Sequence, residues 1–93
     1  MRFKVTLFAA FREICGDREL VIEGEGPLTL EEALRELFGR CKGDLEREVM
    51  EGDRIKDNVV IMVNGRNAKQ LNDLRTVIRD GDEISIFPPV GGG

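Results

Sequence analysis

The chain has 93 residues, of which 41% are hydrophobic and 34% charged, and its net charge is −4 at pH 7. A chain of this length forms one small domain with a single core and leaves no room for a deep active site. The acidic balance provides no basic surface for nucleic acid, and no apolar run reaches the roughly 18 residues of a membrane span. With no recognisable signal peptide, we expect a cytoplasmic protein that has no nucleic-acid or membrane partner.

The residue types present argue against an enzyme in its own right. The chain has no histidine, tyrosine or tryptophan, and its only serine, Ser85, lies in a predicted strand. Its carboxylates are spread over turns and helix faces, so no group is an evident general acid or base. Cys15 and Cys41 form no Cys-x-x-Cys pair, and without histidine we expect no metal site. Cys41 is predicted to be a buried, inert thiol, and we expect no catalytic or redox role for either cysteine.

The first part of the chain predicts two strands and a short helix. Residues 2–8 alternate polar and apolar side chains, so that Phe3, Val5 and Leu7 mark the buried face of a strand. Residues 9–15 have the spacing of a short helix. Residues 19–23 predict a second strand.

The clearest helix begins at Thr29. This residue is a good N-cap and has Glu32 three positions later, which is the pattern of a capping box. From Leu30 to Cys41 the apolar residues recur at helical spacing, which predicts a helix with one face in the core. Residues 43–58 are highly charged and predict at most a short helix around Leu45 and Val49.

Further strands follow the helix. Residues 59–63 are continuously apolar, which predicts a strand that is either buried on both faces or exposes an apolar face. Asn64 and Gly65 give a strong hairpin signal, and residues 83–87 alternate as a last strand. With the first strand parallel to the last, the order predicts an α+β fold of the β-grasp (ubiquitin-like) type: a mixed sheet of about five strands with one main helix across it.

The chain ends in Pro-Pro-Val-Gly-Gly-Gly. Proline lacks an N–H for a sheet ladder and fixes φ, so Pro88 and Pro89 are expected to end the strand. Three residues without a Cβ fit a channel in which any side chain would clash. We therefore divide the chain into a domain, residues 1–87, and a flexible tail, residues 88–93, that is presented to another protein's active site. The alternative is an ordinary frayed terminus.

Three segments resemble the MoaD family, the small sulfur-carrying subunit of molybdopterin synthase, which is related to the thiamine sulfur carrier ThiS and to ubiquitin. Residues 8–13, Phe-Ala-Ala-Phe-Arg-Glu, match the family's Phe-Ala-x-x-Arg-Glu, and residues 63–65 read Val-Asn-Gly. The most specific segment is residues 80–90, which runs from Asp-Gly-Asp to Pro-Pro-Val before the glycines. Many relatives have Ser, Ala or Thr in place of Gly91.

The resemblance implies a carrier that has no catalytic groups and no bound cofactor. A ubiquitin-activating-type (MoeB/ThiF-like) enzyme would adenylate the carboxylate of Gly93 with ATP, and a sulfur donor would convert the adenylate into a thiocarboxylate. The tail would then enter the large, MoaE-like subunit of molybdopterin synthase. There it would give its sulfur to a pterin that binds molybdenum or tungsten.

The same resemblance assigns roles to further residues. The channel-binding tail comprises Gly92, Gly91, Val90, Pro89 and Pro88. Phe8, Phe87 and Arg12 are candidates for the partner interface. Phe8 has the alternative of a covered core position, and Arg12 with Glu13 has the alternative of local capping or pairing.

Three other functions remain open on the sequence. One is a ubiquitin-like modifier that is joined through Gly93 to lysines of target proteins. Another is a sulfur carrier for thiamine or for tRNA thiolation. The last is a β-grasp interaction module whose tail is incidental.

Overall fold

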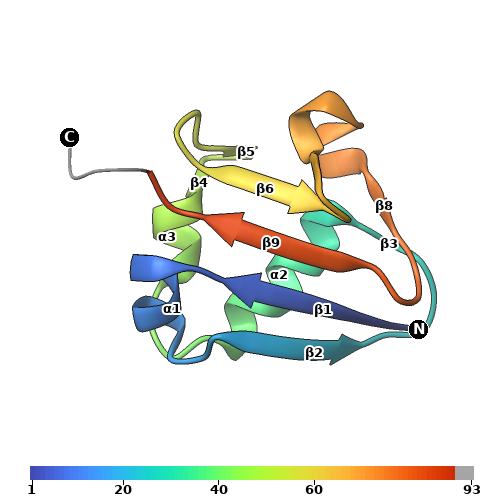
Figure 1. The fold of residues 1–93 in the computed structure, drawn as a ribbon, viewed down its shortest axis with the longest axis horizontal. Coiled ribbons are helices and arrows are strands. Elements are labelled where there is room, and N and C mark those ends of the chain that lie inside the picture. Colours follow the sequence, from blue (N-terminus) through green and yellow to red (C-terminus); the bar gives the residue numbers. More distant parts are fainter. Residues whose placement is uncertain (90–93) are drawn as a thin grey trace.

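A computed structural model describes residues 1–89, in which helices cover one face of a mixed five-stranded sheet (Figure 1). The sheet has the order β2-β1-β9-β6-β7. Its strands are β1 (Arg2–Leu7), β2 (Glu19–Glu23), β6 (Val60–Val63), β7 (Arg66–Asn67) and β9 (Glu83–Phe87). β1 pairs antiparallel with β2 and parallel with β9, and β6 pairs antiparallel with both β9 and β7. The predicted β-grasp fold, with its first and last strands parallel, is confirmed.

The helices and short elements complete the fold. The helices are α1 (Ala9–Cys15), α2 (Leu30–Arg40) and α3 (Leu45–Val49), and two 3₁₀ turns follow at Ala68–Gln70 and Asp73–Arg75. Two small sheets lie outside the main one: β3 (Leu28–Thr29) pairs with β8 (Val77–Ile78), and β4 (Met50–Glu51) pairs with β5 (Arg54–Ile55). The short helix expected within residues 43–58 is therefore present as α3.

The core lies between α2 and the inner face of the sheet. Alternation along β1 and β9 turns every second side chain toward the helix, and each of these inner residues is almost fully buried. α2 contributes the apolar stripe that its sequence predicts. The largest fully buried side chains are those of Phe3, Leu7, Ile22, Leu30, Leu34, Leu37, Leu45, Ile61, Ile78, Ile84, Ile86 and Val5.

The capping box at the start of α2 is present. The Glu32 N–H donates to Thr29 Oγ1 at 3.2 Å, and the Thr29 N–H donates to Glu32 Oε1 at 2.9 Å. The hydrogen bond from the Thr29 backbone, followed by that from its hydroxyl, lowers the pKa of Glu32. The stabilisation from this carboxylate is therefore present above its unfolded-state pKa and is lost as pH falls through the lower folded-state pKa.

We expect Thr29→Ala to lower the free energy of unfolding by about 1 kcal/mol, because the Glu32 N–H loses its acceptor. For a domain of this size the melting temperature should fall by about 4–8 °C. Thr29→Ser keeps the hydroxyl and is the matched control, expected to melt close to the wild type. Thermal denaturation of the three proteins tests the prediction, and equal melting of the alanine and serine variants would contradict it.

The Asn64–Gly65 turn joins β6 to β7 as predicted, and both residues have positive φ angles, 51° and 81°. The Asn64 side chain also connects the turn to the start of β9. Its Oδ1 accepts from the Glu83 N–H at 2.9 Å, and its Nδ2 donates to Asp82 Oδ1 at 3.0 Å. The turn residue therefore helps to fix the start of the strand from which the tail leaves.

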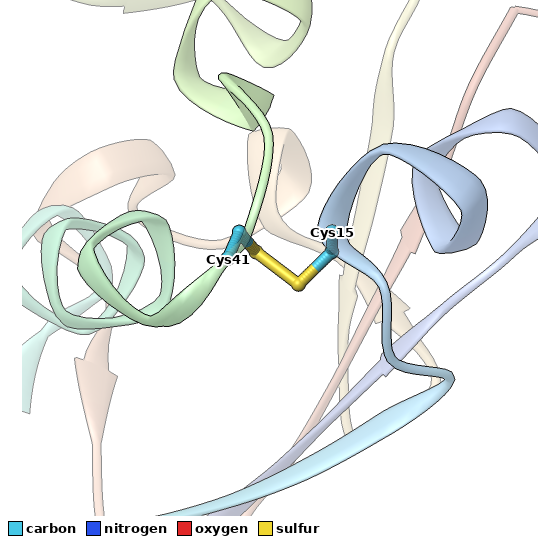
Figure 2. Close-up of a disulfide and its surroundings, with 2 residues drawn as sticks. All are labelled: Cys15 and Cys41. Atoms are coloured by element: carbon cyan, nitrogen blue, oxygen red, sulfur yellow. A yellow bond between two sulfur atoms is a disulfide. The ribbon is translucent and has the colours of Figure 1, made fainter.

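The two cysteines form a disulfide, which corrects the prediction that Cys41 is a free, buried thiol (Figure 2). Cys15 is the last residue of α1, and Cys41 is the C-cap of α2. Cys15 is fully buried, whereas Cys41 is only half-buried, because the last turn of α2 carries it to the rim of the core. The prediction was wrong because the pairing depends on two helix ends that meet only in the folded chain.

Candidate functional site

The chain leaves the domain at the end of the sheet where β1 and β9 both finish. The two strands are parallel, and Leu7 lies opposite Ile86 in their register. Phe8, which follows β1, is therefore brought beside Phe87, the last residue of β9. Their rings are stacked with centroids 4.3 Å apart and planes 13° apart. In Figure 1 both strands run toward the end of the sheet at which α1 and α3 lie.

Both rings are half-buried and lie on the face of the sheet that the helices leave open. Alternation explains this position: Leu7 and Ile86 point into the core and have no exposed surface, so the next residue on each strand points the other way. The alternative of a covered core position for Phe8 is therefore not what the structure shows. Its role at an interface stays a prediction.

Two further apolar residues extend this surface, and sequence reasoning missed both. Val60 on β6 lies opposite Phe87 in the strand register and is 36% exposed, and half-buried Met62 lies opposite Ser85. We call Phe8, Phe87, Val60 and Met62 the apolar patch. The apolar run of residues 59–63 was the available signal, but it left open which face was exposed. In the structure Ile61 and Val63 face the core, so the even-numbered residues of β6 face outward.

The opposite end of the open face is charged. Lys4 Nζ lies 3.1 Å from Glu83 Oε1, and Arg2 Nη2 lies 2.7 Å from Glu23 Oε1. The hydrogen bond to Glu83, with the negative charge of that carboxylate, raises the pKa of Lys4, and the hydrogen bond from Arg2 lowers the pKa of Glu23. The open face is thus apolar where β1 and β9 end. Where they begin it carries the two ion pairs, together with Val21, which lies opposite Lys4 and is 52% exposed.

The root of the predicted tail directly follows the apolar patch. Pro88 is half-buried and Pro89 is exposed. The other residues predicted for the tail, Val90, Gly91, Gly92 and Gly93, lie outside the described residues. The patch and the departure point of the chain are therefore neighbours in sequence and at one end of the sheet.

Arg12 is exposed on α1, the helix that starts immediately after Phe8. Its backbone carbonyl accepts from the N–H of Gly16, which closes the helix with a left-handed φ of 93°. Among residues 1–89, none of the ion pairs in the structure involves Arg12. Local ion pairing of its side chain, which was one alternative to the interface role, is thus not seen, and its place in an interface stays a prediction.

The described part of the chain shows neither a metal centre nor a membrane segment. Over residues 1–89, no three or more Cys, Asp or Glu side chains converge in a way that could hold a metal ion. None of the helices in this range has the length and apolar character that a membrane span requires.

The chain is similar to known proteins over nearly its whole length. A profile of the ThiS family matches residues 5–93. Small archaeal modifier protein 3 of Haloferax volcanii is 33% identical over 93 residues, with 100% of both chains covered. The molybdopterin synthase sulfur carrier subunit of Haemophilus influenzae is 33% identical over 89 residues, with 96% of each chain covered. The crystal structure of SAMP1 from Haloferax volcanii superimposes with a TM-score of 0.84 at 31% identity, with 100% of both chains covered.

Proposed function

The chain belongs to the ThiS family, whose ubiquitin-like members include sulfur carriers and protein modifiers, and we propose that it is a sulfur carrier for molybdopterin synthesis. The terminal glycine, Gly93, is the reacting residue in this proposal. Its carboxylate is converted to a thiocarboxylate, and the sulfur passes to a pterin that binds molybdenum or tungsten.

The observation that carries the proposal is the position of the stacked Phe8–Phe87 pair at the root of the tail. An apolar patch gives a partner a hydrophobic anchor, since aromatic residues are enriched at interface hot spots. A partner that covers this patch has the departing chain directly beside it. Pro88 and Pro89 restrict that chain, which reduces the conformational entropy lost when it enters a channel.

The chemistry of the proposal balances without a catalytic group on the carrier. A carboxylate oxygen of Gly93 attacks the α-phosphate of ATP on a MoeB/ThiF-like enzyme, which releases pyrophosphate and leaves an acyl-adenylate. A sulfur nucleophile from the donor then attacks the acyl carbon, and AMP leaves with the electrons of the broken bond. A MoaE-like large subunit receives the thiocarboxylate in its active site. These three partners are proposals that rest on the family.

The similarity to the Haemophilus influenzae molybdopterin synthase subunit supports the molybdopterin role. The similarity to small archaeal modifier protein 3 supports a second candidate function, attachment of the Gly93 carboxylate to lysines of other proteins. Both functions need the same adenylate, and they differ in whether sulfur or an amine attacks it. Sulfur supply for thiamine or tRNA thiolation is a further outcome that the acceptor would reveal.

Intact-mass analysis tests the proposal directly. The chain is incubated with the adenylating enzyme of the same organism, ATP and hydrosulfide, and a gain of about 16 Da on the C-terminal peptide is expected as sulfur replaces oxygen. Addition of the large synthase subunit and the cyclic pterin precursor should then remove the added mass. A lasting thiocarboxylate that never reaches the pterin would contradict the molybdopterin role. ATP-dependent isopeptide adducts without any mass gain would favour the modifier.

We expect Phe87→Ala to weaken binding to the large synthase subunit by about 2 kcal/mol, roughly 30-fold in Kd, because the change removes one ring of the stacked pair. Isothermal titration calorimetry measures the effect. Val77→Ala is the control, since Val77 is 44% exposed on β8, outside the main sheet. An unchanged Kd for the Phe87 variant, or an equal loss in both variants, would remove the apolar patch from the interface.

A further inference from the structure

The two residues of the Cys15–Cys41 disulfide differ in their exposure to solvent. Cys15 has no exposed surface, whereas Cys41, at the C-cap of α2, is half-buried. Thiol–disulfide exchange requires a nucleophile to reach one of the two sulfurs. In the folded chain only Cys41 presents a surface for that approach.

The backbone holds the two cysteines together independently of the bond between them. The Lys42 N–H donates to the carbonyl of Cys15 at 2.9 Å, and the Gly43 N–H donates to the carbonyl of Ile14 at 3.0 Å. A Cβ on Gly43 would lie 2.6 Å from that Ile14 oxygen, so this close approach requires glycine. The sulfurs therefore stay adjacent when the bond opens, and the bond can form again without unfolding.

The accessible cysteine lies between two cationic residues, Arg40 and Lys42, in the sequence. The stem of Lys42 crosses over Gly16, since a Cβ at Gly16 would lie 2.9 Å from Lys42 Cδ. Positive charge around a cysteine attracts an anionic sulfur nucleophile. Arg40 Nη2 lies 4.0 Å from Glu36 Oε2, so Lys42 is the cation that favours approach of a thiolate or of hydrosulfide.

We propose that Cys15–Cys41 is a thiol–disulfide exchange site for small anionic sulfur nucleophiles, with Cys41 as the sulfur attacked. A thiolate attacks Cys41 Sγ, forms a mixed disulfide and expels the Cys15 thiolate, which takes a proton from water. A second thiolate attacks the small molecule's sulfur in the mixed disulfide and releases Cys41 as a thiolate. The net step oxidises two thiols of the small molecule to one disulfide and reduces the protein bond by two electrons.

The state of this bond determines how firmly α1 is held. The bond fixes the last residue of α1 to the end of α2, and the N-cap of α1 is Phe8, which stacks on Phe87. Opening the bond leaves the C-terminal end of α1 held by the backbone hydrogen bonds of residues 42 and 43 and by packing. Any effect on docking rests on the proposed function, whereas the exchange chemistry does not.

Two single variants test which sulfur is reactive. Cys15→Ala and Cys41→Ala both lack the disulfide, so they are matched in having lost the cross-link. In the folded variants, iodoacetamide should alkylate Cys41 at least about tenfold faster than Cys15. Glutathione added to the oxidised wild type, followed by an acid quench, should give a mixed disulfide on the Cys41 peptide. Equal alkylation rates, or glutathione on Cys15, would overturn the assignment.

Hydrogen exchange of the oxidised and reduced wild type tests the effect on α1. After reduction, the amides of Gly16, Lys42 and Gly43 should exchange at least about tenfold faster than the core amides of β1, which report global unfolding. If these amides exchange at the same rate as those of β1 in both the oxidised and the reduced protein, the bond does not hold α1 locally. Neither experiment involves Gly93, so failure here is separate from failure of the sulfur-carrier proposal.

Discussion

Removal of Gly93 is expected to lower thiocarboxylate formation by more than about 100-fold and to leave the melting temperature unchanged. An extended chain gains roughly 3.3 Å per residue, so in the proposed function the shortened tail would end one residue before the α-phosphate of ATP. Reacting atoms need to approach within about 3–3.5 Å, and small misplacements already cost about 100-fold in rate. The tail cannot slide forward to compensate if docking of the apolar patch fixes its starting point. Among residues 1–89 the buried core residues lie between Phe3 and Ile86, and the deletion removes none of them.

Val77→Ala is the control for this deletion, because Val77 is 44% exposed on β8, outside the main sheet and outside the tail. The variant keeps the length of the tail and should form the thiocarboxylate at close to the wild-type rate. The wild type, the deletion and the control are each incubated with ATP, adenylating enzyme and hydrosulfide, and the intact mass reports how much thiocarboxylate each one forms. Comparable mass gain in the shortened chain would mean that the position of the terminal carboxylate is not recognised, and the proposed chemistry would fail.

The elements that the sequence predicted well are those with strong local signals. The capping box at Thr29 depends on residues three positions apart, and the Asn64–Gly65 turn depends on two adjacent residues that tolerate positive φ. Alternation likewise predicted β1 and β9, because the inner residues of both strands face one core. Each of these features is decided within a few residues of the chain, so a single sequence is enough to find it.

The candidate site was predicted only in part, since it depends on strand register. Phe8 and Phe87 were both named from the sequence, but their stacking follows from the parallel pairing of Leu7 with Ile86. Val60 joins the patch because β6 pairs with β9 so that Val60 lies opposite Phe87. The register between two distant strands cannot be predicted from the alternation of polar and apolar residues within either strand.

The disulfide was missed for a related reason. Cys15 and Cys41 are 26 positions apart, and they meet because α1 and α2 end at the same place. The apolar stripe of α2 correctly placed Cys41 toward the core side, and a buried thiol was the simplest reading of that pattern. The spacing of apolar residues in α2 contains no information on the path of residues 16–29. That path determines where the end of α1 lies relative to the end of α2.

Reduction of the disulfide is expected to lower the stability of the domain strongly. The bond closes a loop between residues 26 positions apart, for which the chain-entropy relation gives about 3.5 kcal/mol. In a domain of this size each kcal/mol shifts the melting temperature by about 4–8 °C, so a fall of roughly 14–28 °C is expected. A domain with a single small core has a low free energy of unfolding, so the cross-link contributes a large share of that free energy. Calorimetry of oxidised and reduced protein measures the shift, and a fall of less than about 5 °C would contradict it.

The double variant Cys15→Ala, Cys41→Ala separates the cross-link from the packing of the sulfurs. Reduced wild type keeps both sulfur atoms, whereas the variant also loses the Sγ of fully buried Cys15, so it should melt lower still. A reducing agent should leave the variant unchanged. If the bond acts mainly by restricting the denatured chain, the guanidinium m-value should rise on reduction, because the freed chain exposes more surface when it unfolds. A fall in melting temperature at constant m-value would instead place the stabilisation in the folded state, where α1 meets α2.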